Sequence, residues 1–532
     1  MGRLRAGLDR LAAEPYAPRF SRVERRVLWL LTLSAALIRC AFQFDREFQG
    51  DEVGTLIHMD RSIPYLLTHC ETWLTMNVFI VFEKLVGQVL GRGPLALGIL
   101  PLLAGVSQVP LLACLARRFT TKRAALTAAA LVALNPFLIE SSGRIRSYSL
   151  LAALSLLLLI TFLNWWRRRD LKAGLAAALA ATLLLLSHPL GLYPLLLILI
   201  AAGLDAALPP RGRNFRSLLL PLSIGLALVA LAYAGILRPL FEESARWHSG
   251  MLTSFEYLPY LQNGYFGGTP LRWVFLLLLL AGATSLWRRR TGSTLLLLGL
   301  VLPSLLMSIQ GLAHRPWAYQ RLLIFQLPIL LLLVAEGVSV LSARRRGLGA
   351  LVLSLLLLGW WPGFRQLFEE KPRRSGSPLL AAARFVEERF EPGDLLVADR
   401  SLDLLHLRNY LPPRRFAGMT LERFLDDPEA RQGRFFFWSR TRLASTQPRV
   451  ETQAGSMVIY AGEHPLRALQ LEALTTLSGQ PGRQQQVDCH GLLCRLEKAL
   501  PAASGVDHCA FWEQHRTVTR RERVARIGRL FR

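Results

Sequence analysis

The feature that most constrains this chain is a series of long apolar runs that carry almost no charge. Three examples are Leu151–Leu163, Val274–Leu286 and Leu348–Trp361. With its flanks, each run approaches the roughly 20 residues that a helix needs to cross the hydrocarbon of a bilayer. A helix also satisfies its own backbone hydrogen bonds, which lipid cannot do. Since 52% of the 532 residues are hydrophobic, we predict a polytopic α-helical membrane protein.

The net charge of +26 is spread over short loops. Basic clusters follow alternate apolar runs, among them Arg117-Arg118, Arg167–Arg169, Arg288–Arg290 and Arg344–Arg346. An excess of Lys and Arg in every second loop marks the cytoplasmic side of a membrane protein. Nucleic-acid binding is disfavoured, because a site for a polyanion would gather its charges on one surface.

Counted with this rule, the apolar segments predict about eleven crossings, near residues 27–43, 95–115, 124–140, 148–166, 172–187, 190–207, 217–237, 272–287, 292–309, 320–340 and 347–362. Segment 1–26 is then cytoplasmic, and 27–362 forms the membrane domain. Within it, an outer loop with interfacial helices covers 44–93. Trp73–Leu90 belongs to that part, because it is apolar but contains Glu83 and Lys84.

Residues 363–532 have no spanning run and are long enough for one soluble domain. Ala381–Phe390 has the pattern of an amphipathic helix, and Leu395–Ala398 that of a short buried strand. Phe435–Trp438 and Met457–Tyr460 are further strand candidates. We therefore predict a small soluble α/β domain, which the crossing count places outside the cytoplasm.

Three cysteines in this tail, Cys489, Cys494 and Cys509, constrain it further. In an oxidising compartment two of the three should pair, with α-carbons within about 7 Å of each other. Metal ligation by Cys489, His490 and Cys494 is the alternative, but this spacing matches no established zinc pattern.

Residues able to carry chemistry gather in the loops predicted to lie on the outer side. The acidic pair Asp51-Glu52 follows the apolar run Val27–Phe42, in FQGDEVGT. Carboxylates close to hydrocarbon are costly unless solvated or paired, so they tend to mark functional sites. A solvated start of a loop is the simpler interpretation. Further candidates in these loops are His69, Glu71, Glu140, Arg144, Arg146, Tyr148, His188, His248, His314, Arg315, Trp317, Tyr319 and Arg321.

The arginines among them, Arg144, Arg146 and Arg321, break the cytoplasmic bias of positive charge. A guanidinium offers planar, bidentate hydrogen bonds to phosphate oxygens. Carboxylates and arginines around one outer cavity would suit a reaction that needs a base and releases a phosphate. The alternative is that each arginine pairs with a local acid such as Glu140.

Residues 44–165 resemble the GT-C glycosyltransferases that use polyprenyl-phosphate sugars, including protein O-mannosyltransferases and the aminoarabinose transferases of lipid A. The acidic pair and the segment VPLLACLARRFTTKRAALTAAALVALNPFLIESSGRIRSYSLL carry the likeness. Tyr319-Gln320-Arg321-Leu322-Leu323 and the tail segment EPGDLLVAD match later parts of the pattern. Two segments depart from it: SSGRIRSY stands where SQEARMY is usual, and Thr75-Met76-Asn77 replaces an HPP motif.

The resemblance implies an enzyme that transfers a sugar from a polyprenyl-phosphate donor to an acceptor hydroxyl on a lipid, glycan or protein. It implies an integral protein of the bacterial inner membrane and an inverting reaction. Asp51 is then the general base and Glu52 its partner or replacement. Arg321 and Arg146, with Arg144 and Tyr319, would bind the donor phosphate. Substrate-binding candidates are Tyr148, His69, Glu71, His188, His248, Trp317 and Arg315. A divalent metal is left open.

Three alternatives remain at the level of sequence. A lipid-linked glycan ligase with an oligosaccharide donor would share this layout. A transporter or flippase would place polar residues near the bilayer midplane, where this chain is mostly Leu, Ala and Val. An inactive, membrane-anchored binding protein would fit the two altered motifs.

The alternating basic loops generate a prediction about topology. A reporter that works only in the cytoplasm should stay silent when it is fused after Arg532, because the tail is expected outside. The same reporter fused before Val27 should be active. Activity of the carboxyl-terminal fusion would contradict the crossing count.

Overall fold

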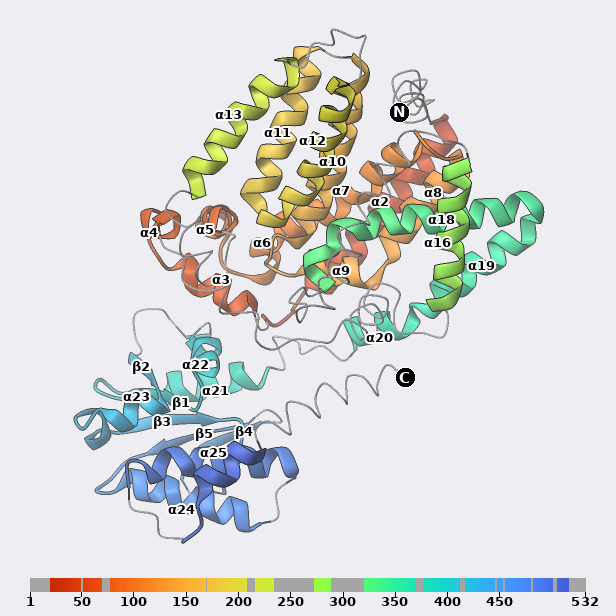
Figure 1. The fold of residues 1–532 in the computed structure, drawn as a ribbon. Helices are drawn as coiled ribbons and strands as arrows, with labels where there is room; N and C mark the ends of the chain where they lie inside the picture. Colours follow the sequence, from red (N-terminus) through yellow and green to blue (C-terminus); the bar gives the residue numbers. More distant parts are fainter. Residues whose placement is uncertain are drawn as a thin grey trace. The chain divides into compact units, whose positions relative to one another are not determined.

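The structure is a computed structural model that describes residues 20–48, 51–68, 77–168, 170–207, 216–233, 272–288, 320–369, 377–408, 410–411, 417–444, 447–452, 455–479, 482–500 and 505–515. The chain divides into two compact units (Figure 1). The first comprises Met1–Phe44 and His58–Lys371, and the second Asp45–Ile57 and Pro372–Arg532. The short stretch after the first helix therefore belongs with the carboxyl-terminal part of the chain, which differs from the division expected from the sequence.

The first unit is helical throughout its described residues. Five of its helical segments are long and apolar enough to cross a membrane: α2 (Arg22–Gln43), α7 (Ile99–Ala116), α10 (Tyr148–Arg168), Leu323–Ala343 and Gly347–Phe368. A sixth span arises if the bent pair of α8 (Lys122–Leu134) and α9 (Pro136–Gly143) is counted as one. The chain is thus a polytopic helical membrane protein.

The span Leu323–Ala343 consists of the end of η2 (Gln320–Gln326) and most of α18 (Leu327–Arg344), and the span Gly347–Phe368 consists of α19 (Arg346–Gly359) and α20 (Trp361–Phe368). Three further helices hold shorter apolar stretches: α11 (Leu171–Ser187), α13 (Arg216–Tyr233) and α16 (Arg272–Arg288). The remaining elements are α4 (Ile63–Thr68), α5 (Asn77–Leu90), α6 (Pro94–Leu97), η1 (Pro189–Gly191) and α12 (Leu192–Ala207). The count of about eleven crossings stays a prediction, since segment 292–309 lies outside the described residues.

The crossing expected at 124–140 is bent by 53° between α8 and α9. Pro136 causes the break, because it has no N–H to offer the carbonyl of Val132 four residues earlier. Asn135 caps the new helix, accepting a hydrogen bond at Oδ1 from the N–H of Leu138 at 3.0 Å. The break leaves backbone carbonyls at the end of α8 that need other donors.

Arg39 on α2 supplies them. Its side chain is fully buried, and Nη2 donates to the carbonyl of Val132 at 3.2 Å while Nη1 donates to that of Ala133 at 3.0 Å. One turn further on, Gln43 donates to the carbonyls of Gly98 at 3.0 Å and Gly143 at 3.4 Å. Two polar residues of α2 therefore satisfy backbone groups at both ends of α9.

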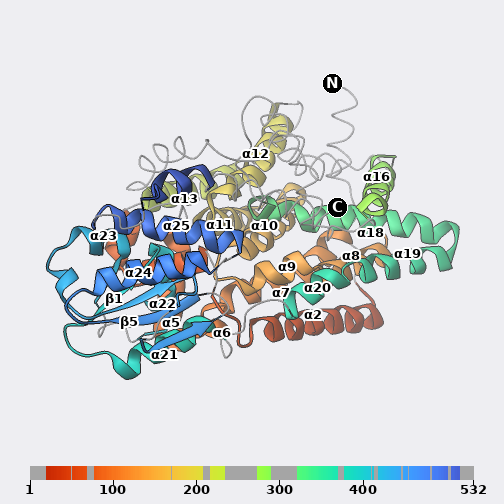
Figure 2. The same ribbon diagram turned by 90° about the horizontal axis from the view of Figure 1, so that it is seen from below.

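Small residues let these helices come close together. A Cβ on Gly105 of α7 would lie 2.3 Å from the Cβ of Ser142, and one on Gly143 would lie 2.2 Å from the ring of Phe42. Figure 2 shows α2, α7 and α9 running alongside one another, with α20 beside them. Phe364, Leu367 and Phe368 of α20 pack onto Phe42 and Ile139.

The second unit holds a five-stranded sheet in the order β2-β1-β3-β5-β4. Its strands are β1 (Leu395–Ala398), β2 (Ala417–Thr420), β3 (Phe435–Ser439), β4 (Arg449–Thr452) and β5 (Gly455–Tyr460). β1 pairs in parallel with β2 and with β3, and in the second pair Leu395 lies opposite Phe435. β5 runs antiparallel to both β3 and β4. The strands expected at 395–398, 435–438 and 457–460 are all present.

Helices cover both faces of this sheet (Figure 1). On one face, Leu396, Phe436 and Met457 pack against α21 (Pro378–Arg389) and α22 (Ser401–Arg408). On the other, residues such as Phe435 and Tyr460 pack against α23 (Leu421–Asp426), α24 (Pro465–Ser478) and α25 (Arg483–Glu497). Burial on both faces explains why β3 reads FFFWS without polar alternation. A 3₁₀ turn, η3 (Ala430–Gln432), precedes β3, and α3 (Asp51–Met59) belongs in its first part to this unit.

Replacing Arg39 with Leu should strongly destabilise the helical unit. The carbonyls of Val132 and Ala133 would lose their donors in a buried, apolar setting, which costs about 2–4 kcal/mol of unfolding free energy. Unfolding of the purified protein by detergent titration measures this. Leu37→Ala, on the exposed face of the same helix, is the control and should change little. Equal stability of the Arg39 variant and this control would contradict the role given to Arg39.

Candidate active site

The chain leaves α2 through Asp45, whose φ of 56° lies in the left-handed region. Aspartate tolerates this conformation better than most residues, because its short side chain can bond to nearby backbone groups. The turn starts the stretch that leads to α3, whose first two residues are Asp51 and Glu52. A predicted catalytic pair thus begins a helix, where the N-terminal end favours negative charge.

Glu52 is 1% exposed and forms a bidentate ion pair with Arg46. The two bonds are 2.6 Å from Nη1 to Oε2 and 2.5 Å from Nη2 to Oε1. Both side chains are almost completely buried, where the fork of a guanidinium compensates the cost of desolvating a carboxylate. Glu52 is therefore a fixed, neutralised member of the acidic pair.

Glu47, a carboxylate that lies before the acidic pair in the chain, is also buried. Its Oε1 accepts hydrogen bonds from the hydroxyls of Ser377 at 2.5 Å and Tyr410 at 2.9 Å. His406 lies in the same unit, and its pKa is lowered mainly by burial, while the charges of Asp403 and Glu52 oppose the shift. The stretch from Asp45 to α3 is therefore built into the α/β unit by charged and polar contacts.

A second group of candidates meets in the helical unit, between the start of α10 and the end of α11. The guanidinium carbon of Arg146 lies 5.8 Å from the centre of the Tyr148 ring, and that ring is 5.8 Å from the ring of His188. All three side chains are buried. The sequence predicted each as a site residue, and the structure brings these three together.

His188 is neutral at ordinary pH. Burial, and next the positive charge of Arg146, lower its pKa to about 3. Its Nδ1 accepts a hydrogen bond from the N–H of Leu190 at 3.1 Å, which leaves the proton on Nε2. The cluster therefore combines one cation with hydrogen-bond donors, a composition that suits an anionic oxygen.

Arg144 behaves differently, since its Nη2 pairs with Glu140 at 2.5 Å on a partly exposed surface. Local pairing was the alternative left open by the sequence. Several other predicted site residues lie outside the described residues: His69, Glu71, His248, Arg315, Trp317 and Tyr319. The side chains of Asp51 and Arg321 also lie outside the description, although their backbones belong to α3 and η2.

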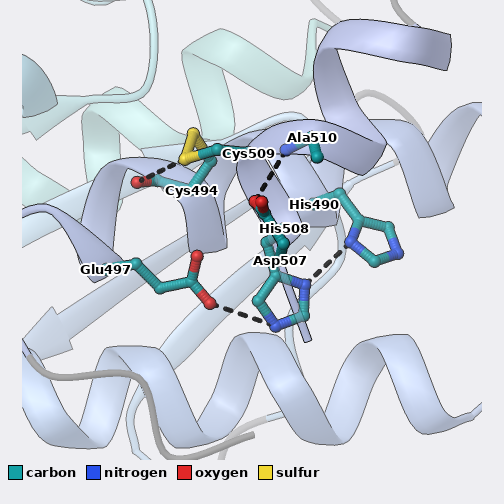
Figure 3. Close-up of a disulfide and its surroundings, with 7 residues drawn as sticks. All are labelled: His490, Cys494, Glu497, Asp507, His508, Cys509 and Ala510. Carbon is teal, nitrogen blue, oxygen red and sulfur yellow. Dashed lines mark hydrogen bonds and ion pairs between the residues drawn. A yellow bond between two sulfur atoms is a disulfide. The ribbon is translucent and has the colours of Figure 1, made fainter. Parts of the chain in front are cut away.

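The cysteine prediction is confirmed by a disulfide between Cys494 of α25 and Cys509, with α-carbons 4.6 Å apart (Figure 3). Cys489 is a buried free thiol. Cys494 therefore has no thiolate to offer a metal, and the alternative of a Cys489, His490 and Cys494 site is wrong. Within the described ranges no group of three His, Cys, Asp or Glu residues is arranged to hold a metal ion.

Beside the disulfide, two buried histidines face each other (Figure 3). The Nδ1 atoms of His490 and His508 are 2.8 Å apart, and Nε2 of His508 lies 3.4 Å from Glu497. His490 also stacks on Phe511, with ring centres 3.7 Å apart. A hydrogen bond between the two Nδ1 atoms needs one of them to accept, so protonation of the accepting Nδ1 would set two N–H groups against each other.

Comparison with solved structures decides the fold. ArnT from Cupriavidus metallidurans in the apo state aligns with a TM-score of 0.56 and 14% identity, over 81% of this chain and 97% of that chain. ArnT bound to undecaprenyl phosphate gives the same values. The arabinofuranosyltransferase AftD from Mycobacteria aligns with a TM-score of 0.52 and 14% identity, over 84% of this chain and 40% of that chain. The chain has a GT-C glycosyltransferase fold.

No protein-family model matches the sequence, and no curated protein sequence matches it. The GT-C fold is therefore recognised through the arrangement of its elements in space. It agrees with the resemblance drawn from the acidic pair and from the segment around Arg146.

The sequence patterns did not single out Arg46 and Glu47, which lie a few residues before the acidic pair. A signal was present, since charged residues cluster in DREFQGDE. The partners of Glu47, Ser377 and Tyr410, come more than 300 residues later in the chain, and no local pattern indicates such a pairing.

The histidine pair predicts how acid affects this GT-C chain. Burial, followed by the charges of His508 and His515, lowers the pKa of His490 to about 4. Because this value is below the ordinary value of about 6.5, neutral His490 stabilises the fold above pH 6.5, and that stabilisation is lost as pH falls towards 4. The thermal midpoint should therefore drop less between pH 7 and pH 4.5 in His490→Gln than in the wild type.

His464 is the matched control, because it is exposed and belongs to the same unit. His464→Gln should retain the acid sensitivity of the wild type. Identical acid sensitivity in all three proteins would show that His490 does not govern this response.

Proposed function

We propose that this chain is an inverting glycosyltransferase that moves a sugar from a polyprenyl-phosphate donor to an acceptor hydroxyl at the outer face of the bacterial inner membrane. The observation that carries the proposal is the acidic pair at the start of α3, directly after the first membrane helix of a GT-C fold. A base at the membrane surface is what this reaction requires, because the acceptor hydroxyl must lose its proton as it attacks.

The two carboxylates have different tasks. Glu52 already accepts two hydrogen bonds from Arg46, so its oxygens are occupied and it orients the start of α3. Asp51 is the general base and takes the proton of the acceptor hydroxyl. A bond then forms between the acceptor oxygen and the anomeric carbon, the bond from that carbon to the phosphate oxygen breaks, and polyprenyl phosphate leaves.

The leaving phosphate develops negative charge, which fixed cations stabilise. Arg146 is buried beside Tyr148 and neutral His188, and we assign this cluster to the phosphate. Arg321 is the second phosphate ligand proposed from the sequence. Arg144 is a weaker candidate, because Glu140 already pairs with it. The proposed donor lipid follows the ArnT structure, whose bound molecule is undecaprenyl phosphate.

In the proposed orientation, the amino terminus is cytoplasmic and the α/β unit lies outside. Two observations support it: the alternating basic loops and the disulfide between Cys494 and Cys509, a bond that persists in oxidising compartments. The acceptor, a lipid, glycan or protein, would then be met on the outer side.

Asp51→Asn and Arg321→Ala should fail in different ways. The first keeps size and polarity but removes the base, so transfer should fall by about 10²–10⁴-fold while undecaprenyl phosphate still binds. The second removes a planar fork for phosphate, so binding of undecaprenyl phosphate should weaken, with partial rescue by Arg321→Lys. Release of undecaprenyl phosphate measures transfer, and native mass spectrometry measures binding.

Arg365→Ala and Glu388→Gln are matched controls, since both side chains are exposed and each forms an ion pair with a residue close in sequence, Glu369 and Arg389 respectively. They should change neither quantity. Normal transfer by Asp51→Asn together with loss in Glu52→Gln would assign the base to Glu52. Normal transfer by both variants would overturn the enzymatic proposal.

A further inference from the structure

Glu47 is the one buried carboxylate of the stretch before α3 that the proposed reaction leaves without a task. It is 6% exposed, and a charge is kept in such a place only when its partners compensate for lost water. Ser377 and Tyr410, which donate to its Oε1, come from the carboxyl-terminal part of the second unit. Its contacts therefore join two segments of that unit that are distant in sequence.

The bond from Ser377 has a defined direction. Ser377 is the N-cap of α21, and its Oγ accepts hydrogen bonds from the N–H groups of Leu379 at 3.1 Å and Leu380 at 3.4 Å. Its hydroxyl proton is then available to Glu47. The carboxylate also sits at the N-terminal end of a 12-residue helix, where the helix dipole favours negative charge.

The second donor is anchored in the core. Tyr410 follows α22, and its side chain packs against the cluster that α21 and α22 form on the sheet. Glu47 thus accepts one hydrogen bond from the N-cap of a helix and another from a residue packed against the core. Neither donor can follow a movement of Glu47 without disturbing the α/β fold.

Arg46 connects Glu47 to the acidic pair by hydrogen bonds. Its Nη1 donates to the carbonyl of Glu47 at 3.3 Å and to Glu52 at 2.6 Å. A continuous set of contacts therefore runs from α21 and Tyr410 through Glu47 and Arg46 to Glu52, next to Asp51. All of these residues belong to one compact unit.

We propose that Glu47 is a positioning residue, through which the α/β unit holds the start of α3 and its acidic pair in the geometry needed for transfer. The hydrogen bonds of Glu47 are present whatever reaction the protein catalyses, whereas the effect of Glu47 on catalysis rests on the proposed function. A misplacement of about 1 Å at a reacting group can lower a rate by about 10²-fold. The carboxyl-terminal part of the α/β unit then contributes to catalysis, although the reacting pair comes from the segment Asp45–Ile57.

The first test needs no substrate. In the full-length protein, Glu47→Ala should increase hydrogen exchange of the α3 amides by about 10–100-fold, which corresponds to loss of hydrogen bonds to a buried charge. Glu47→Gln should exchange almost like the wild type, because its amide oxygen can still accept both hydroxyls. Unchanged exchange in Glu47→Ala would overturn the proposal.

Tyr460→Phe is the matched control. It removes a bond between a buried tyrosine and a carboxylate, Glu472, in the same unit but on the opposite face of the sheet. It should lower overall stability as Glu47→Ala does, while exchange in α3 stays at the wild-type level. Equal exchange in both variants would show that α3 reports only general destabilisation.

The second test measures turnover. Undecaprenyl-phosphate-linked aminoarabinose and mannose serve as donor probes, with membrane extract as acceptor, and released undecaprenyl phosphate is quantified. Glu47→Ala should lower kcat by about 10²-fold with little change in the KM for the donor. Tyr410→Phe should lower kcat less, and the double variant should be no slower than Glu47→Ala, because both act through one contact.

The outcomes separate the two proposals. If no variant, including Asp51→Asn, differs from the wild type in turnover while exchange in α3 changes as expected, the proposed function fails and the structural tie stands. If Asp51→Asn abolishes transfer but Glu47→Ala is as active as Tyr460→Phe, the positioning role fails and the proposed function stands.

Discussion

The described architecture depends on one buried guanidinium, that of Arg39, which donates hydrogen bonds to two carbonyls at the end of α8. A proline at 136 breaks the helix and frees the carbonyl of Val132. In an apolar interior an unsatisfied carbonyl is expensive, so the break persists because a donor from another helix reaches it. The same bonds give the buried guanidinium acceptors for both of its terminal nitrogens. The bend of α9 and the direction of α2 are therefore determined together.

This coupling has consequences at the end of α2. Gln43 completes the set of bonds to α9, after which the chain reaches the start of α10, where Arg146 lies beside Tyr148 and His188. In the other direction α2 ends at Asp45, and the stretch that follows belongs to the α/β unit. The cationic cluster therefore belongs to the first unit and the acidic pair to the second.

Much of this was accessible from local sequence. Apolar runs of spanning length predicted the membrane helices, and short β-branched or aromatic runs predicted three strands at their observed positions. Tyr148 and His188 were predicted as substrate-binding residues, and the structure places them in one cluster. The bend at Pro136 was missed, although the Asn135-Pro136 dipeptide is a recognised break signal, because the apolar pattern continues through it. The pairing of Glu47 with Ser377 and Tyr410 had no local signal at all.

The sequence by itself determined the surroundings that each segment favours: lipid for the long uncharged runs and water for the mixed-charge tail. These properties follow from composition and spacing, which act locally. Only the tertiary structure decided which carboxylate of the acidic pair is neutralised, which arginine is buried beside an aromatic ring and which pairs at the surface, and which two cysteines join. Each of those outcomes depends on distances between residues far apart in the chain, and packing alone sets such distances.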